Sequence, residues 1–496
     1  MGWGVVSAGG LARKSVGVPS LWFFAVSASA PMTVVAGGIV QTYAATGIVG
    51  VALAFLVLAL ALALLSVGPV AMARHVGSAA PFYTLLARGL GPAAGVAGGL
   101  VALVGYNAVQ IALYGLLGAT LSGLFGGAWW AWAVGCCVLI AALGVVRVDI
   151  GASVVGVLAV VEVAVLVGLV AGGLTHPADG FTLDPVRPGN LFVTGVGGVL
   201  ALSIAAFVGF ETTLAFGEEA RSGSAIGRAT FRTLLLIGPF YALCAWAIVV
   251  ATGPDAVAQA ARDDPNLAIT MIAQTGGLVF GPLLASLASM LLITSIFAAM
   301  LSFHCTVARY VFALGREHVL PSVLGRTGTG NRSVRDAPIG GSLVQSGIAA
   351  AAVTLFAVTG ANPITTVFTL LAALAAVAIL ALLLAASVAS IRWFRAGGGA
   401  NEDRWERVIG PGLAVVAGAV VLGTTVANFG ALVGTGQHSP LTLALIGVVG
   451  LAVAAGLGWA GVLAAARPQV YRGIGDGKPA DLAVADRRLD DVKLWR

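Results

Sequence analysis

Twelve long apolar stretches dominate this sequence and exclude most other classes of structure. Of the 496 residues, 59% are hydrophobic and 9% are charged, a balance that a globular domain in water does not reach at this length. About 20 consecutive apolar residues cross a bilayer as one helix. We therefore expect an all-α integral membrane protein with twelve transmembrane helices. The expected spans are residues 22–43, 48–68, 92–118, 128–147, 152–174, 191–217, 232–252, 278–314, 340–359, 364–391, 408–430 and 440–465.

The distribution of basic residues predicts the orientation of these spans. Short loops rich in Lys and Arg stay on the cytoplasmic side of a membrane. With Arg13 and Lys14 inside, only Arg187 and Arg262 among the basic residues fall in outer loops. Both termini are therefore expected in the cytoplasm, and the chain is expected to be a multi-pass protein of the plasma (cell inner) membrane. The net charge of +6 follows from this topology, so no nucleic-acid partner is expected.

The spans divide into two blocks of five, followed by two further spans. Because five is odd, the second block is inverted relative to the first, and inverted repeats are common in secondary transporters. We expect the first repeat at residues 22–174, the second at 191–391 and two peripheral helices at 408–465. Residues 1–21 and 466–496 are expected to form a cytoplasmic N-terminal segment and a cytoplasmic tail.

Spans 1 and 6, which correspond in the two blocks, both contain residues that weaken a helix. Residues 29–38 of span 1 include Pro31 and Gly37, and residues 207–212 of span 6 include Gly209. A matched pair of interruptions is the sequence feature that best indicates a transporter binding site. The alternative is that these residues are the kinks and close-packing points that are common in membrane helices.

Glu211 in span 6 and Glu162 in span 5 are the two acidic residues inside the expected spans. A carboxylate within a bilayer is costly and is retained mainly for function. Such a group can take up and release a proton during a transport cycle. Glu211 could instead only brace the interruption by bonding freed amides. Glu162 could pair structurally with a hydroxyl or amide of span 1, or help to coordinate a cation.

Polar residues of spans 3 and 8 are further candidates for lining a cavity. Span 8 supplies Ser302 and His304, and an imidazole titrates near neutral pH. Asn107 and Gln110 lie on one helical face of span 3. These side chains could equally bond their own helix or join neighbouring helices. The four cysteines have neither the spacing nor the histidine partners of a metal site, and no metal or cofactor is expected.

Three sequence motifs are similar to the signatures of the amino acid, polyamine and organocation permeases. They are residues 207–211 (Phe-Val-Gly-Phe-Glu) with 217–221 (Gly-Glu-Glu-Ala-Arg), residues 308–321 after span 8, and residues 77–83 (Gly-Ser-Ala-Ala-Pro-Phe-Tyr). The resemblance covers about residues 20–465. It implies a LeuT-like transporter fold of five plus five inverted helices with two peripheral helices. It also implies alternating access to a site between spans 1, 3, 6, 8 and 10.

The resemblance further implies a substrate site at the two interruptions. Amides of span 1 would receive a substrate carboxylate, and carbonyls freed in span 6 would accept its ammonium. Many members have a glycine–serine–glycine run in span 1 that this chain lacks, so amines or other organocations also fit. The expected substrate-binding residues are Met32, Thr33, Ala36, Gly37, Asn107, Gln110, Phe207, Gly209 and Phe210.

Two acidic positions carry the expected coupling chemistry of the family. Glu211 matches a glutamate that arginine and agmatine exchangers use in gating and pH response. Ala205 stands where those relatives have an aromatic that stacks on the substrate, which argues against arginine–agmatine exchange. Proton-coupled relatives often carry a lysine at the position of Glu162. We expect gating or proton coupling to involve Glu211, Glu162, Ser302 and His304.

These features predict a secondary active transporter of an amino acid or related amine, coupled to protons or working by exchange. Spans 1, 2, 6 and 7 would rock against the rest. A sodium-coupled symporter is the alternative, because the Glu162 carboxylate and span 8 hydroxyls are hard oxygen ligands. An enzyme or a channel is not expected, since neither a cluster of catalytic residues nor a filter loop is visible. The expected partners are the small-molecule substrate, protons or sodium, and the lipid bilayer.

Overall fold

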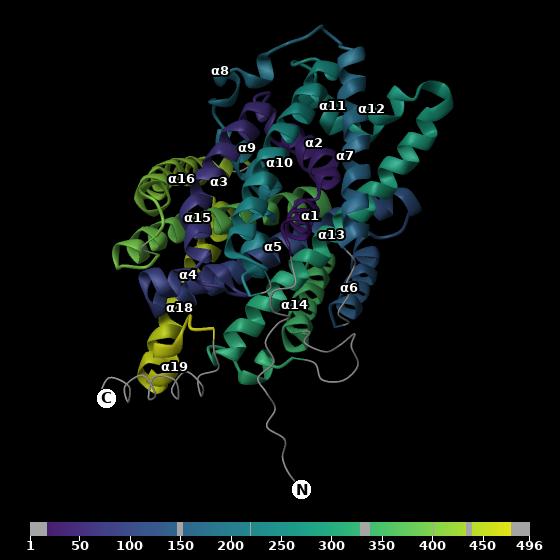
Figure 1. Ribbon diagram of the computed structural model, residues 1–496. Coiled ribbons are helices and arrows are strands. Elements are labelled where there is room, and N and C mark those ends of the chain that lie inside the picture. The colour runs from purple at the N-terminus through teal and green to yellow at the C-terminus, as the bar shows by residue number, and fades with distance from the viewer. Residues whose placement is uncertain are drawn as a thin grey trace, which may run out of the picture.

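The computed structural model describes residues 17–145, 152–218, 220–327, 338–399, 401–432 and 439–477. Within these ranges the chain consists of helices joined by turns and loops, without a β-strand. In Figure 1, α8 (Pro188–Leu191) and α11 (Val257–Asp263) lie at one end of the molecule, and α19 (Pro468–Gly473) lies at the other. We refer to these as the α8 end and the α19 end.

The long helices correspond to the spans expected from the apolar stretches. Ten helices of the described chain are long and apolar enough to cross a membrane, and a bent pair makes an eleventh candidate. Helix α6 (Trp129–Val145) occupies the place of expected span 4 but has only 17 described residues. The total of twelve therefore remains a prediction. The other long helices are α3 (Val51–Ala73), α5 (Pro92–Phe125), α7 (Ala152–Thr175), α10 (Gly223–Thr252), α13 (Gly277–Arg316), α14 (Ile339–Val358), α15 (Thr369–Arg395), α16 (Gly410–Ala427) and α18 (Pro440–Ala466).

Spans 3 and 10 form the centre of the helix assembly. In α5, and in the span of α15 together with η5 (Pro363–Phe368), 83% of the most apolar window is buried inside the protein. The same share is 22% for α18 and 33% for the span of α16 with η6 (Trp405–Ile409). A helix that is apolar all round yet poorly covered by protein faces lipid. The windows of α7 and α14 are covered to a similarly small extent, 33% and 28%, so all four spans lie at the outside of the assembly, and the separate peripheral role of the last two spans stays a prediction.

Span 1 is broken immediately before its proline. Helix α1 (Val18–Ala28) ends at Ser29, and Ala30 has a φ of 44°, which is rare for a residue with a side chain. The chain is helical again over residues 31–46, as η1 (Thr33–Ile39) and α2 (Val40–Thr46). Pro31 lacks an N–H and disfavours a helical conformation in the residue before it. The interruption is therefore shorter than the residues 29–38 that the sequence suggested, because Gly37 and Gly38 lie within the helical part.

Span 6 is broken at its glycine. Helix α9 (Val196–Phe207) and η3 (Phe210–Phe216) are bent by 40° at Gly209, which has a φ of 122°. A Cβ atom at Gly209 would lie 2.8 Å from the carbonyl carbon of Ala28. A glycine is thus required both by the backbone conformation and by close approach. The two interruptions lie against each other in the structure.

Several short helices lie between the spans, and one of the spans is unusually long. Helix α4 (Pro81–Leu90) lies between spans 2 and 3, and all but two of its residues are buried. Helix α13 has 40 residues, about 60 Å at 1.5 Å per residue, so it extends beyond a bilayer core of about 30 Å. The others are η2 (Asp184–Val186), α12 (Leu267–Thr275), η4 (Ser322–Gly325) and α17 (Phe429–Leu432).

The buried Glu317 carboxylate connects the segment after α19 to the end of α13 by hydrogen bonds. Glu317 accepts hydrogen bonds from the Tyr83 hydroxyl at 2.6 Å and from the amides of Gly475 at 2.7 Å and Gly477 at 2.8 Å. Burial raises the pKa of Glu317, although these donors and Arg316 oppose the shift. Three elements distant in the sequence therefore depend on one side chain: α4, α13 and residues 475–477.

We expect Glu317→Ala to destabilise the α19 end. The substitution leaves the buried Gly475 amide, the partly buried Gly477 amide and the Tyr83 hydroxyl without this acceptor, at about 1–3 kcal/mol for each group that stays unsatisfied. Thermal unfolding in detergent should show a midpoint lowered by several degrees. Glu402→Ala is the control and should have a smaller effect, because Arg74 keeps its pairing with Glu406. Equal midpoints for wild type and Glu317→Ala would contradict this role.

Candidate functional site

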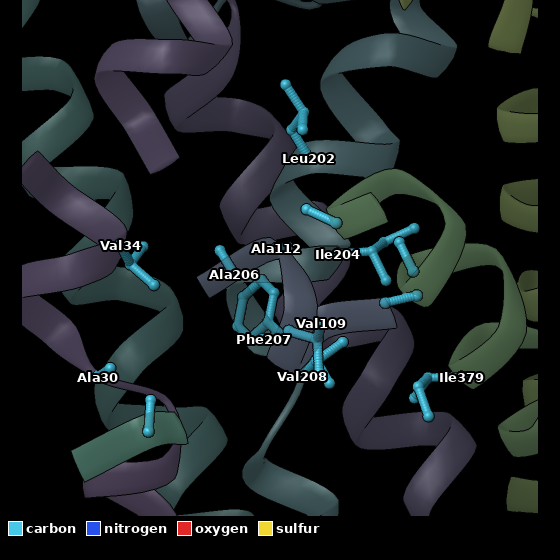
Figure 2. Packing of buried hydrophobic residues seen from close by; sticks show 14 of the residues in the cluster. Ala30, Val34, Val109, Ala112, Leu202, Ile204, Ala206, Phe207, Val208 and Ile379 are labelled. Carbon is cyan, nitrogen blue, oxygen red and sulfur yellow. The ribbon is translucent and has the colours of Figure 1, made fainter. Parts of the chain in front are cut away.

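The two helix interruptions enclose a small cavity in the middle of the protein. Its free space is about 50 Å³, room for roughly four water molecules. Figure 2 shows part of its wall, with Ala30 and Val34 of span 1 on one side and Val109 of α5 on the other. The lining residues are Ala28, Ser29, Ala30, Thr33, Val34, Gly38, Val109, Ala112, Leu113, Leu202, Ala205, Ala206, Val208, Ala299, Phe303, Phe368 and Ala372.

This lining comes from spans 1, 3, 6, 8 and 10. It contains no charged side chain, and alanine is its most frequent residue. The polar side chains are those of Ser29 and Thr33. The Ser29 hydroxyl donates to the Ala25 carbonyl at 2.9 Å, whereas the buried Thr33 hydroxyl has no hydrogen-bond partner in the described part of the chain. Thr33 is therefore the polar side chain available to a bound molecule.

Glu162 lies beside the start of the second half of span 1. One oxygen of its buried carboxylate accepts from the Met32 amide at 3.1 Å and from the Ser295 hydroxyl at 2.9 Å. The Thr33 amide donates to the same hydroxyl oxygen at 3.4 Å. Glu162 thus satisfies a backbone group that the interruption frees and links α7, span 1 and α13.

Glu211 lies at the interruption of span 6. One oxygen accepts from the Gly209 amide at 2.9 Å, and the other is buried without a hydrogen-bond partner among the described residues. The neighbouring Thr212 hydroxyl donates to the Gly209 carbonyl at 2.5 Å. Tyr106 of α5 interacts electrostatically with the carboxylate. A buried acceptor without a donor is unusual, and Glu211 therefore has capacity for a proton or a hydrogen bond.

The polar residues expected on spans 3 and 8 do not line the cavity. His304 bonds the Ser342 hydroxyl of α14 at 2.8 Å, and Gln110 bonds Gln345 of the same helix. The Asn107 side chain donates to Leu103 of its own helix at 2.7 Å. These contacts join helices or satisfy a local carbonyl.

The other expected site residues, which belong to spans 1, 6 and 8, differ in their relation to the cavity: one lines it, some pack beside it, and the rest contribute no side chain to it. Of the residues proposed for substrate binding, only Thr33 lines the cavity, and Met32 contacts Glu162. Gly209 packs on span 1, and Phe207 packs on Phe55, with ring centroids 5.7 Å apart. The remaining expected residues, which contribute no lining side chain, are Ala36, Gly37, Phe210 and Ser302.

The sequence interpretation missed most of the apolar wall. Val109, Ala112 and Leu113 lie at helical spacing on α5, and Ala299 and Phe303 do so on α13. Nothing in the sequence distinguishes this apolar face from the faces that contact lipid or other helices. Attention to polar side chains therefore selected a face of span 3 that does not line this cavity.

Two side-chain contacts link span 8 to the segment after the span 6 interruption. Arg316 of α13 bonds Glu218, which follows η3, at 2.8 Å and 3.3 Å. The Arg309 guanidinium lies 4.2 Å from the centre of the Phe216 ring. Both contacts connect the segment after the span 6 interruption to span 8. Movement of these spans relative to each other would have to break them.

Comparison with known proteins agrees with this architecture. The sequence profile described as amino acid permease matches residues 22–463. The fold is similar to that of a manganese transporter from Eremococcus coleocola, crystallised with an aromatic bis-isothiourea substituted compound. The TM-score is 0.52 at 14% identity, over 91% of this chain and 98% of that one. No curated protein sequence matched the chain. Because the profile spans nearly all of the membrane helices, this chain belongs to the amino acid permease family of the amino acid, polyamine and organocation superfamily, and it is a transporter and not an enzyme.

Proposed function

We propose that this protein carries an amino acid or related amine across the plasma membrane by alternating access, coupled to protons or to exchange. The observation that supports this most directly is the Glu162 carboxylate, which holds the Met32 amide and the Ser295 hydroxyl at once. A titratable group at this place can connect the charge state of one side chain to the position of span 1.

The proposed movement is a rocking of spans 1, 2, 6 and 7 against the other spans. In this motion span 1 moves relative to α7 and α13. An ionised Glu162 accepts from the Met32 amide and so holds span 1 against α7. Proton uptake by Glu162 removes the negative charge and weakens this charge-assisted bond, so that span 1 is released. Binding of a proton and movement of the bundle are thereby coupled.

Glu211 is proposed to gate the same movement at span 6. Its one bonded oxygen holds the Gly209 amide at the interruption, and its other oxygen is unpartnered in the described chain. If this oxygen accepts a hydrogen bond in one conformation of the transport cycle and not in the other, it stabilises the conformation in which the bond is made. Tyr106 of α5, which belongs to the static part, is the neighbouring group that would change its position relative to Glu211.

The proposed topology places the α19 end in the cytoplasm. Gly17 lies beside Arg221, Arg221 follows Glu218 in the sequence, Glu218 pairs with Arg316, and Glu317 holds Gly475. The first and last described residues therefore lie at the same end, as an even number of spans requires. We propose two inverted repeats over residues 22–174 and 191–391, peripheral helices over 408–465, and a cytoplasmic N-terminal segment and tail.

Uptake driven by a pH gradient should depend on Glu162. In proteoliposomes, Glu162→Gln should lower uptake driven by an inwardly directed proton gradient by roughly tenfold or more. Counterflow, which needs no net proton movement, should persist, because glutamine keeps the volume and one acceptor oxygen. Asp263→Asn, which removes an exposed carboxylate bonded by Gln259 of the same short helix, is the matched control for loss of an acidic charge. Unchanged gradient-driven uptake by Glu162→Gln would exclude this coupling role.

Substitution of Glu211 should affect the rate of the cycle. Glu211→Gln retains an oxygen for the Gly209 amide but loses the negative charge, so we expect slower counterflow and a flatter dependence of its rate on pH. Thr212→Val, which removes the hydroxyl bonded to the Gly209 carbonyl, controls for local distortion of the interruption. A wild-type pH profile in Glu211→Gln would show that Glu211 only braces the helix.

Sodium coupling is the second candidate, and the oxygens of Glu162 and Ser295 favour it. They lie 2.9 Å apart next to a helix interruption, and sodium, like other hard cations, prefers oxygen ligands. Replacement of sodium by choline distinguishes the candidates. Proton coupling predicts unchanged uptake, whereas loss of uptake in choline would favour sodium symport.

A further inference from the structure

The cavity wall limits the size of the substrate, which membership of the family alone does not specify. Alanines form much of the wall, including Ala205 and Ala206 of span 6, Ala299 of span 8 and Ala372 of span 10, so the size of the cavity is set by the spacing of the helix backbones and by the larger lining side chains. The free space of about 50 Å³ accommodates only a few non-hydrogen atoms. Longer or aromatic substrate side chains would collide with Phe303, Phe368 and Leu113, which also line it.

The absence of charged side chains from the cavity lining restricts the charge of the substrate side chain. Burial of a charge without a partner is very costly. The lining provides no charged side chain for a basic or acidic substrate. Glu162 and Glu211 lie behind the interruptions and bond the Met32 and Gly209 amides. The charge of a substrate side chain would therefore remain unpaired, whereas an amino acid with a neutral side chain needs partners only for its carboxylate and its ammonium.

Thr33 supplies the remaining specific contact. The first amides of the second half of span 1 are already used, because Met32 donates to Glu162 and Thr33 to Ser295. The next amide, that of Val34, donates to the Ala30 carbonyl at 3.0 Å. The buried Thr33 hydroxyl has no partner in the described chain and belongs to the lining. It lies near the start of the helix over residues 31–46, where the helix dipole favours negative charge.

We infer that this protein selects amino acids with small neutral side chains, of the size of glycine and alanine, and that the Thr33 hydroxyl donates to the substrate carboxylate. This inference rests on the proposed amino acid transport and names its substrate class. Selection is by exclusion, since the small free space bounded by Leu113, Phe303 and Phe368 has no room for longer side chains and the uncharged lining does not compensate a side-chain charge. The Thr33 hydroxyl takes the role of donor to the substrate carboxylate, because the Met32 and Thr33 amides already donate to Glu162 and Ser295.

Counterflow in proteoliposomes with a graded panel tests the size limit. The panel contains glycine, alanine, valine, leucine, phenylalanine, arginine and glutamate. We expect glycine and alanine to exchange, and leucine, phenylalanine, arginine and glutamate to be at least roughly tenfold slower at equal concentration. Leucine or arginine counterflow equal to that of alanine would overturn the inference while leaving amino acid transport intact. Absence of counterflow with every member would instead refute the proposed function and this inference with it.

Two further variants locate the selectivity in the cavity. Leu113→Ala enlarges the wall and should raise leucine counterflow relative to alanine by roughly tenfold. Leu117→Ala removes the same atoms one turn away on α5, outside the lining, and should leave the ratio unchanged. An equal ratio in Leu113→Ala, Leu117→Ala and wild type would place selectivity elsewhere. Because the readout is a ratio of two substrates, a lower amount of folded protein does not affect it.

Substitution of Thr33 tests the contact to the carboxylate. Thr33→Val retains the shape and removes the hydroxyl, so the KM for alanine should rise roughly tenfold, the loss of one hydrogen bond to a charged group. Thr33→Ser should restore the KM towards the wild-type value. An unchanged KM in Thr33→Val would remove Thr33 from the substrate site.

Discussion

A membrane span can be interrupted only where other groups take over its backbone hydrogen bonds, and this structure depends on that constraint. Hydrocarbon provides no water for a freed amide or carbonyl, and each unsatisfied group costs several kcal/mol. At span 1 the Met32 amide is satisfied by Glu162, and at span 6 the Gly209 amide is satisfied by Glu211. Each intramembrane acid thus bonds one interruption, which explains why two carboxylates are retained in a chain with 9% charged residues.

The close approach of the two interruptions follows from small residues. Gly209 lies against Ala28, and the Tyr241 hydroxyl of α10 donates to the Ser29 carbonyl at 3.0 Å. The cavity is what remains between the two interruptions and the apolar faces of spans 3, 8 and 10. The same arrangement that permits both helices to break therefore also limits the size of the cavity and excludes side-chain charge from its wall.

Much of the fold could be predicted from the sequence, because long apolar stretches, proline and glycine act locally. Pro31 and Gly209 mark the interruptions, and helices occupy the expected spans of the described chain. The lining could not be predicted, because α5 is apolar on nearly all sides and no periodicity distinguishes the face of Val109 from the others. His304 and Gln110 attracted attention as polar residues, but they bond α14. The Met32 amide is a span 1 partner of the kind that was considered for Glu162, whereas the contact with Ser295 depends on elements that meet only in the folded protein.

The central claim is that Glu162 takes up a proton when the substrate is carried. The most direct measurement is the internal pH of proteoliposomes that contain a trapped pH-sensitive dye, after alanine is added outside without an imposed pH gradient. The account predicts alanine-dependent acidification of the interior with wild-type protein and none with Glu162→Gln, although alanine counterflow persists in that variant. Equal acidification by both proteins would contradict the account.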